Sequence, residues 1–327
     1  MSFTSFAIRI HQTGGPEQMR WEAFTVNAPA AGEVLIRQHA VGLNFIDVYH
    51  RNGLYPIPLP SVLGLEGAGV VDAVGAGVTH FAVGDRVAYA GGPIGAYAEL
   101  RCIPAHRLLK LPEQIDFVSA AAMMLQGLTS AYLLRRTYRV QAGDTVLIHA
   151  AAGGVGLIAC QWANALGATV IGTVSNAAKA ALASAHGCHH VIDYTREDVA
   201  QRVRALTNGA GVAVVYDGVG KDTFSASLDS LRVRGMMVSF GNASGSVPSF
   251  DPQILAQKGS LFITRPTLMN YIAEPAELAQ LGEELFSVVS SGQVKIEVHQ
   301  TYALADAANA HRDLEARKTT GSTVLLP

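Results

Sequence analysis

The stretch HAAAGGVGLIACQWANALGATVIGTVSNAAK, residues 149–179, has the residue types and spacing of a dinucleotide-binding turn. It is an altered G-x-G-x-x-G pattern, in which Ala151 replaces the first glycine while Gly153 and Gly156 keep the other two. The second glycine lets the backbone approach a pyrophosphate, and the third lets the helix pack closely on the preceding strand. The first serves the tight turn, where alanine is acceptable if φ stays negative. We therefore expect the cradle to survive, the alternative being a plain packing turn.

The residues after the next strand indicate which dinucleotide is bound. An NAD site places Asp or Glu at the end of the second strand, about 20 residues after the glycines. Here Ser175 and Asn176 follow the strand, and no acid occurs before Asp193. Ser175 is expected to cap the next helix, and Lys179 lies one helical turn further on, where both could meet a 2′-phosphate. The pattern predicts NADPH, the alternative being that Lys179 is a solvated helix residue.

Strands and helices alternate strictly around this turn. Val/Ile-rich strands are expected at residues 145–150, 168–174, 190–194, 212–217, 235–241 and 261–264, with helices at 155–166, 175–186, 197–206 and 224–231. This alternation predicts a parallel sheet with helices on both faces.

The first third of the chain is different, because it is rich in short β-type runs. These lie at residues 7–10, 34–43, 68–75, 85–90 and 96–103, and no long helical pattern interrupts them. An all-β unit is expected from residue 1 to about 111. Beyond residue 266, helices at 277–290 and 304–317 and a strand at 322–327 are expected to return to this first domain.

Length and composition limit the classes of function. A chain of 327 residues suits two domains, and a net charge of −2 gives no electrostatic footprint for nucleic acid. The three scattered cysteines indicate reduced thiols, and the N-terminus lacks the apolar run of a secretory signal, so a cytoplasmic protein is expected. The longest apolar stretch, residues 119–134, is expected to be too short and too polar to span a membrane and to form a packed helix instead.

No metal site is expected from the residue pattern. Cys188, His189 and His190 form a candidate cluster, but the two histidines enter a strand, where consecutive side chains point to opposite faces. They cannot easily ligate one ion.

Several stretches match one known family in order along essentially the whole chain. They are GGPE (14–17), VGLNFIDVYHRNGLYP (41–56), GLEGAGVV (64–71), HAAAGGVGLIACQWA (149–163), VVYDGVG (214–220), MVSFGNASG (237–245) and LFITRP (261–266). The chain resembles the zinc-independent NADPH:quinone oxidoreductases, of the zeta-crystallin type, in the medium-chain dehydrogenase/reductase superfamily. The resemblance implies an α/β protein: a GroES-like β-rich catalytic domain (1–125 and 267–327), a Rossmann doubly wound parallel sheet (126–266) and an active site in the cleft between them.

The resemblance also bears on zinc. Zinc-dependent relatives carry a cysteine near Asp47, a histidine near Leu65 and a lobe of four close cysteines, whereas Cys102 stands alone in the lobe region of this chain. Zinc sites need three or four N or S ligands, so the ligand count excludes zinc.

Residue roles follow from the resemblance, position by position. Asn44, Tyr49 and Tyr55 are expected to line the nicotinamide and substrate end, with the two tyrosines as hydrogen-bond donors. The expected cofactor-binding residues are Val48, Thr129, Tyr132, Gly153, Gly154, Val155, Ser175, Lys179, Tyr194, Gly218, Phe240, Gly241, Asn242, Arg265 and Arg317. Gln126 stands where relatives often carry lysine, which leaves the substrate preference open.

Each of these roles has a structural alternative. Tyr49 and Tyr55 could be packing residues of the β domain. Asn44 could be a turn residue whose amide binds local backbone. Arg317 could be a solvated residue at a helix end.

The expected function is zinc-independent transfer of reducing equivalents from NADPH to a quinone. The alternatives are NADPH-dependent reduction of the C=C bond of an alkenal or enone, and a non-catalytic NADPH-binding protein. A homodimer is expected through the apolar edge strand at residues 261–264, because an exposed edge is a liability unless it is covered.

Overall fold

The computed structural model describes residues 2–327 and divides the chain into two compact units. The first comprises Met1–Leu128, Ile272–Ser290 and Ile296–Pro327, and the second Thr129–Tyr271 and Ser291–Lys295. The divisions fall a few residues after those expected at 125 and 266, because helix α2 (Phe117–Tyr132) runs on through the first of them without a loop.

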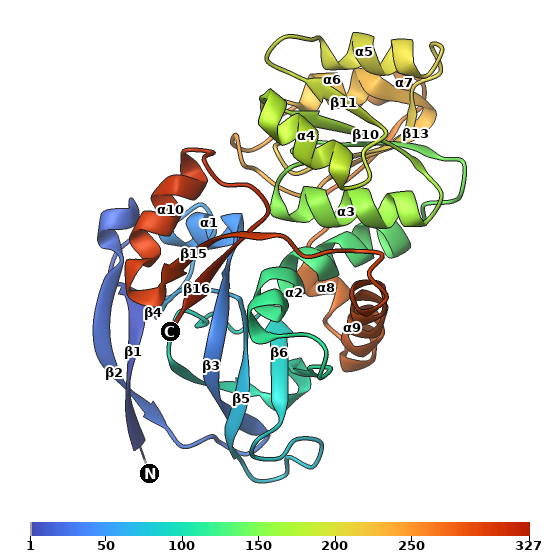
Figure 1. Ribbon diagram of the computed structural model, residues 1–327. Coiled ribbons are helices and arrows are strands. Elements are labelled where there is room, and N and C mark those ends of the chain that lie inside the picture. Colours follow the sequence, from blue (N-terminus) through green and yellow to red (C-terminus); the bar gives the residue numbers. More distant parts are fainter. Residues whose placement is uncertain (1) are drawn as a thin grey trace. The chain divides into compact units, whose positions relative to one another are not determined.

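The first unit is built on two β-sheets (Figure 1). The larger has the order β15-β16-β3-β5-β6-β8 with β7 paired to β3, and the smaller has the order β2-β1-β4. The strands are β1 (Ser2–Ile10), β2 (Arg20–Asn27), β3 (Glu33–Leu43), β4 (Ser61–Val62), β5 (Glu66–Val74), β6 (Arg86–Ala90), β7 (Leu100–Pro104), β8 (Leu109–Lys110), β15 (Val298–Ala303) and β16 (Ser322–Leu326).

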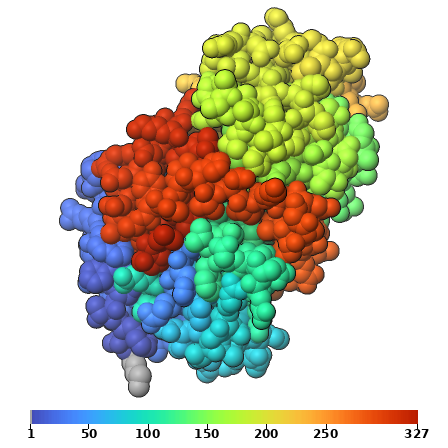
Figure 2. Space-filling model, viewed as in Figure 1, coloured from blue at the N-terminus to red at the C-terminus, as the bar shows by residue number. Residues whose placement is uncertain are grey.

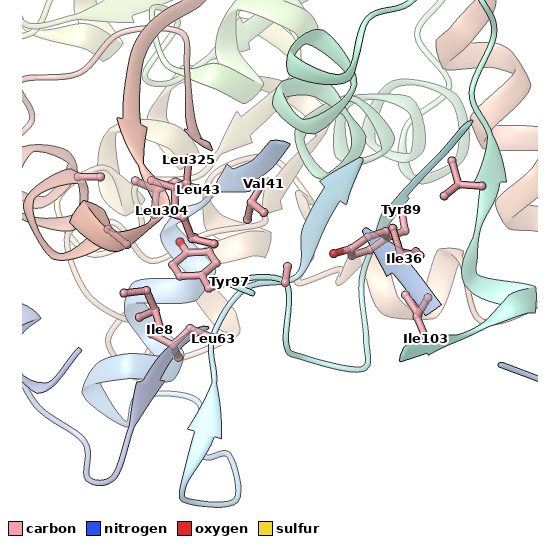
Figure 3. Packing of buried hydrophobic residues seen from close by; sticks show 14 of the residues in the cluster. Ile8, Ile36, Val41, Leu43, Leu63, Tyr89, Tyr97, Ile103, Leu304 and Leu325 are labelled. Carbon is pink, nitrogen blue, oxygen red and sulfur yellow. The ribbon is translucent and has the colours of Figure 1, made fainter. Parts of the chain in front are cut away.

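The core of this unit gathers apolar side chains from nearly every strand. Figure 3 shows the Tyr97 ring among Leu43, Leu63, Leu304 and Leu325, all of which are almost fully buried. The strands therefore contribute side chains to a common interior. This fixes their register, because a shift by one residue would turn the buried side chains to the opposite face of the sheet.

Some elements of this unit were not expected from the sequence. They include the strands β2, β4, β8 and β15 and the short helix α1 (Phe45–Asn52). Helix α1 is only eight residues long and is rich in aromatic and β-branched residues, so its local helical signal is weak. It ends at Gly53, whose φ of 86° is the left-handed conformation that glycine adopts readily.

Most of the C-terminal segment belongs to the first unit, whereas Ser291–Lys295 belongs to the second. Helix α9 (Pro275–Ser290) is followed by β15, helix α10 (Ala307–Glu315) and β16, and β16 pairs antiparallel with β3. In Figure 2 the red C-terminal residues lie directly against blue N-terminal residues. Segments about 280 residues apart in sequence thus form one sheet, with Thr323 opposite Leu43.

The second unit contains a six-stranded parallel sheet in the order β11-β10-β9-β12-β13-β14 (Figure 1). Its strands are β9 (Thr145–Ile148), β10 (Thr169–Val174), β11 (His190–Asp193), β12 (Val212–Asp217), β13 (Leu231–Ser239) and β14 (Phe262–Thr264). Its connecting helices are α3 (Gly154–Ala165), α4 (Ala177–Ala185), α5 (Val199–Leu206), α6 (Phe224–Ser230) and α7 (Gln253–Gln257), and α8 (Leu268–Tyr271) follows the last strand. This is the doubly wound order of dinucleotide-binding domains, so the predicted α/β fold class is confirmed.

One expectation about the long apolar helix is wrong. The helical stretch Phe117–Thr137 has 21 residues and is long and apolar enough to cross a membrane, because a π-helical turn (Leu133–Thr137) extends α2. However, 78% of its most apolar window is buried inside the protein, as in the core helix of a globular fold.

Candidate functional site

The glycine turn joins the end of β9 to the start of α3. Gly153 is the N-cap of the helix and makes no side-chain capping bond, so the N–H groups of the first turn have no capping side chain as acceptor. A Cβ on Gly156 would lie 2.3 Å from the carbonyl oxygen of Ala150, so only glycine allows the helix to pack this closely on the strand end. A 12-residue helix then points an uncapped N-terminus at the carboxyl edge of the sheet, which suits a pyrophosphate.

Alanine is acceptable in place of the first glycine, because the residue with the left-handed backbone conformation lies one position earlier. Ala150, not Ala151, adopts a positive φ of 53°. For a non-glycine residue this conformation costs about 1 kcal/mol. The strain is absorbed at the strand end, and the Gly153 N–H closes the turn by donating to the Ala150 oxygen at 2.9 Å.

The residues expected to select the cofactor cluster at neighbouring strand ends. Ser175 directly follows β10, and Tyr194 directly follows β11 and donates its backbone N–H to Val174 at 3.1 Å. The expectation that Ser175 caps α4 is wrong: the cap is Asn176, whose side chain accepts from the Lys179 N–H at 2.9 Å. Ser175 thus precedes the helix, because the extended backbone of Asn176 intervenes, and Lys179 is in its first turn.

The loops after β12 and β13 pack tightly against each other. A Cβ on Gly241 would lie 2.4 Å from the oxygen of Gly218, and a Cβ on Gly218 would lie 2.9 Å from the Phe240 ring. The Phe240 N–H also donates to Asp217 at 2.8 Å. Because parallel strands end at one edge, Gly218, Phe240, Gly241 and Asn242 share that edge with Gly153.

A buried polar network beneath this edge was missed from the sequence. Asp217 is fully buried and accepts hydrogen bonds from the Val219 and Gly220 N–H groups and from the Ser227 hydroxyl. Since Ser227 donates to Asp217, its oxygen accepts from Nε2 of His149 at 3.0 Å. Burial lowers the pKa of His149, which keeps the ring neutral. The sequence signal that could have indicated this network is Asp217, the acidic residue that ends the apolar run VAVVYD.

The remaining candidates in the second unit lie on three segments. Thr129 and Tyr132 are buried near the end of α2, where the Tyr132 ring stacks on Tyr271 at 4.4 Å. Val155 is in the first turn of α3. Arg265 follows β14 and donates to the Ser239 carbonyl at 3.1 Å, so its guanidinium is held against the end of β13.

In the first unit, Asn44 directly precedes α1, and its amide contacts two other side chains. Its Nδ2 lies 2.6 Å from Oε2 of Glu66, and its Oδ1 lies 3.1 Å from Nε2 of Gln126. Ser322 extends this series of hydrogen bonds, because its hydroxyl lies 2.7 Å from Oε1 of Gln126. Asn44 is also the N-cap of α1 and forms a capping box with Asp47, so it has a local structural role beside these contacts. Glu66 and Ser322 were not identified from the sequence.

Tyr49 and Tyr55 lie together at the C-terminal end of α1. Their rings meet edge to face at 5.2 Å, and the Tyr55 N–H donates to the Tyr49 carbonyl at 3.0 Å. Tyr49 and Val48 are nearly buried, whereas Tyr55 is half-buried. The pair combines an apolar surface with two phenol groups, which is compatible with both packing and catalysis.

Behind α1, a buried chain of hydrogen bonds has one possible direction. Arg51 can only donate, so Nδ1 of His311 accepts from it at 3.1 Å. Nε2 of His311 then donates to the Tyr97 hydroxyl at 3.1 Å, and Tyr97 donates to Oδ2 of Asp47 at 2.9 Å. Burial and the Arg51 charge lower the pKa of His311 to about 3, so the ring is neutral and α10 is tied to α1.

Two further expectations concern Arg317 and metal ions. Arg317 is exposed, directly after α10 in the first unit, with a φ of 59°. Among residues 2–327, no group of three or more His, Cys, Asp or Glu side chains could hold a metal ion. Leu65 has no ligand atom, and Oδ2 of Asp47 is taken by Tyr97 and the Asn44 N–H.

Two family models match the chain. The model described as alcohol dehydrogenase GroES-like domain matches residues 30–113, and the model described as zinc-binding dehydrogenase matches residues 154–283. A quinone oxidoreductase of Pseudomonas aeruginosa is 57% identical over 96% of this chain and 97% of its own. A 2-haloacrylate reductase of a Burkholderia species is 48% identical over 97% of this chain and 98% of its own.

A solved structure agrees with these relatives. The quinone oxidoreductase of Escherichia coli, crystallised with NADPH, is 51% identical, covers 98% of this chain and 100% of its own, and has a TM-score of 0.97. Both sequence and fold therefore match along the full length.

Proposed function

Because the chain belongs to the zinc-independent quinone oxidoreductase family of the medium-chain dehydrogenase/reductase superfamily, we propose that it transfers reducing equivalents from NADPH to a quinone. The structural observation that carries this function is the uncapped N-terminus of α3 at Gly153, at the carboxyl edge of a doubly wound sheet. This turn fits the pyrophosphate of a dinucleotide, and the cofactor is NADPH.

The second unit supplies the groups that hold the cofactor. The first-turn N–H groups of Gly154 and Val155 donate to the pyrophosphate, and Gly153 keeps the approach free of a side chain. Ser175, Lys179 and Tyr194 would bind the 2′-phosphate of the cofactor. Arg317 of the first unit is proposed as a cofactor ligand from the family resemblance alone. The other candidate residues of the second unit line the groove, namely Thr129, Tyr132, Gly218, Phe240, Gly241, Asn242 and Arg265.

The first unit supplies the groups that act on the substrate. NADPH, when bound, supplies a hydride, and a quinone accepts it without a strong acid or a metal ion. The Tyr49 and Tyr55 hydroxyls donate hydrogen bonds to the oxygen on which negative charge develops. Asn44 orients the reacting groups, and the apolar Val48 helps to exclude water.

A spectrophotometric assay tests this function. The purified protein is mixed with NADPH and p-benzoquinone or phenanthrenequinone, and the loss of NADPH absorbance is followed. We expect turnover, and we expect Tyr49→Phe and Tyr55→Phe together to lower kcat by about 10²-fold, as removal of oxyanion donors does. Tight NADPH binding without turnover of any acceptor would instead indicate the binding-protein alternative.

A second activity is favoured by a specific relative. The 2-haloacrylate reductase is 48% identical, and its name describes reduction of an activated alkene. The same tyrosines and cofactor would serve for an alkenal or enone. Comparing kcat/KM for a 2-alkenal with that for p-benzoquinone decides between the two substrate classes.

Assembly and location complete the proposal. Phe262 on the edge strand β14 is 56% exposed, which supports a homodimer that covers this edge. The free thiols of Cys102, Cys160 and Cys188 support a cytoplasmic location. The catalytic and cofactor domains are proposed to coincide with the two compact units.

A further inference from the structure

The Ser322 hydroxyl contacts two acceptors but has a single proton. Its oxygen lies 2.8 Å from the Ala122 carbonyl and 2.7 Å from Oε1 of Gln126. If the proton goes to Gln126, the close approach to the Ala122 oxygen has no hydrogen between the two atoms. A half-turn of the Gln126 amide removes the conflict, because its nitrogen then donates to Ser322 and Ser322 donates to Ala122.

That half-turn has a consequence for Asn44. With Oε1 of Gln126 now facing it, Asn44 has to present its nitrogen at the 3.1 Å contact between the two amides. Its amide therefore turns as well, and its oxygen then faces Oε2 of Glu66 at 2.6 Å. Two oxygens at this distance need a proton between them, and in this arrangement that proton belongs to the Glu66 carboxyl group.

The Asn44–Glu66 distance is compatible with this arrangement. Hydrogen bonds from N–H to oxygen typically span about 2.7–3.2 Å, whereas those from O–H to oxygen span about 2.5–3.0 Å. A contact of 2.6 Å fits the second class. The other Glu66 oxygen, Oε1, accepts from the Leu125 N–H at 2.7 Å in either arrangement.

We propose that Glu66 is a positioning residue whose carboxyl proton sets the orientation of the Asn44 and Gln126 amides. With the proton present, hydrogen bonds run from Glu66 through Asn44, Gln126 and Ser322 to the Ala122 carbonyl. With the proton lost to solvent, both amides turn over and the first three bonds reverse. The inference rests on the proposed function only in taking Asn44 as a substrate-site residue.

The surroundings of Glu66 favour the protonated form at neutral pH. The side chain is fully buried, and burial raises its pKa to about 8, with a further contribution from the Asp47 carboxyl group on α1. The other titratable groups that act with it are Tyr89 on β6 and Tyr97, whose own pKa values are raised by burial, so both remain neutral. The neighbouring cation, Arg101, lies over the Tyr89 ring at 4.8 Å.

The packing around Glu66 limits where its carboxyl group can lie. A Cβ on Gly42 of β3 would lie 2.2 Å from both Oε2 of Glu66 and the Ala121 carbonyl. The carboxyl group is therefore held between β3, α1 and α2, and it cannot turn away to a different partner.

The first experiment observes the carboxyl group without any substrate. The protein is labelled with carboxyl-¹³C glutamate, and isotope-edited infrared difference spectra are recorded on either side of the titration at about pH 8. We expect a protonated-carboxyl signal that disappears on the alkaline side, that is absent in Glu66→Gln and that persists in the control Glu99→Gln. The Glu99 carboxyl group accepts from the Phe6 N–H at 3.0 Å and is not part of the Glu66 network.

The second experiment tests positioning by kinetics. The amide of Glu66→Gln can donate to Asn44 and accept from Leu125 at every pH, so the inflection of kcat/KM near about pH 8 should vanish. Glu66→Ala should lose about tenfold or more in kcat/KM, and Glu66→Gln should recover most of that loss. Gln126→Lys should move the inflection to lower pH, because an adjacent ammonium favours the ionised carboxylate.

The outcomes separate this inference from the proposed function. If no Glu66 carboxyl signal titrates, or if Glu66→Gln shows the wild-type signal, the protonated network is wrong whatever the enzyme reduces. If the signal titrates but the wild type and Glu66→Gln have the same pH profile, the positioning role is wrong. If the signal behaves as expected and no quinone is reduced, the proposed function fails while the protonated network stands.

Discussion

At the scale of single residues, this protein buries two acidic side chains close together. Asp47 and Glu66 are both fully buried, and they contact the backbone and the side chain of Asn44 respectively. Burial raises the pKa of Asp47 to about 7 and that of Glu66 to about 8. A carboxyl group without a charged partner costs less to bury when protonated, so these residues connect folding to pH.

The effect of Asp47 on stability is a testable consequence. Its pKa is raised from 3.8 to about 7 on folding, so its stabilising contribution is complete below about pH 3.8 and is lost as the pH rises to about 7. Asp47→Asn should reduce this decline in the free energy of unfolding, as measured by urea denaturation across the range. The exposed Asp72→Asn, which loses an ion pair with Arg37, should keep the wild-type slope. Equal slopes in wild type and Asp47→Asn would contradict the assignment.

A second residue-scale prediction concerns the choice of cofactor. We expect kcat/KM for NADPH to exceed that for NADH by at least about tenfold, or about 1.4 kcal/mol. Lys179→Ala should weaken NADPH and leave NADH nearly unchanged, because only the 2′-phosphate interacts with that charge. The control is Lys110→Ala, an exposed lysine paired with Asp85. Steady-state kinetics in which Lys179→Ala harms both cofactors equally would show that the lysine does not read the phosphate.

At the scale of elements, the contact between α3 and the end of β9 governs the cofactor cradle. Gly156→Ala places a Cβ 2.3 Å from the Ala150 carbonyl, so the helix has to move away from the strand. We expect a loss of about 1–3 kcal/mol in unfolding free energy and weaker NADPH binding, measured by thermal denaturation and fluorescence titration. Gly153→Ala, whose Cβ would be 3.2 Å from the same oxygen, should destabilise less. Equal destabilisation by the two variants would refute this packing explanation.

At the scale of the whole molecule, the edge of the parallel sheet predicts assembly. Strand β14 pairs only with β13 in the six-stranded sheet, and its Phe262 is exposed. Phe262→Lys should convert a homodimer to a monomer in light-scattering measurements, because the charge opposes burial of the edge. Ile263→Pro should do the same by preventing strand pairing. A wild type that is already monomeric at micromolar concentration would rule out this interface.

Independence from metal ions is a further prediction for the whole protein. Chelator treatment should leave the quinone reductase activity unchanged, and elemental analysis should find no stoichiometric zinc, because Leu65 provides no ligand and Asp47 is engaged with Tyr97. Activity that is abolished by chelation and restored by zinc would contradict it.

The sequence by itself determined the class of the fold and the type of cofactor. Strand and helix periodicity, the glycines at 153 and 156, and the missing acid after β10 are local signals. They were enough to predict the parallel sheet, the dinucleotide and its phosphate. Short elements such as α1 were missed, because eight residues of weak propensity form a helix only when tertiary contacts support them.

Only the tertiary structure decided the surroundings of the candidate site. Asn44 directly precedes α1, and Glu66, Gln126 and Ser322 lie on β5, α2 and β16. The contact between Gln126 and Ser322 joins residues that are 196 positions apart in sequence. Local patterns carry no information about such contacts. They also cannot show which acidic side chains are buried, and burial raises the pKa of Glu66 to about 8.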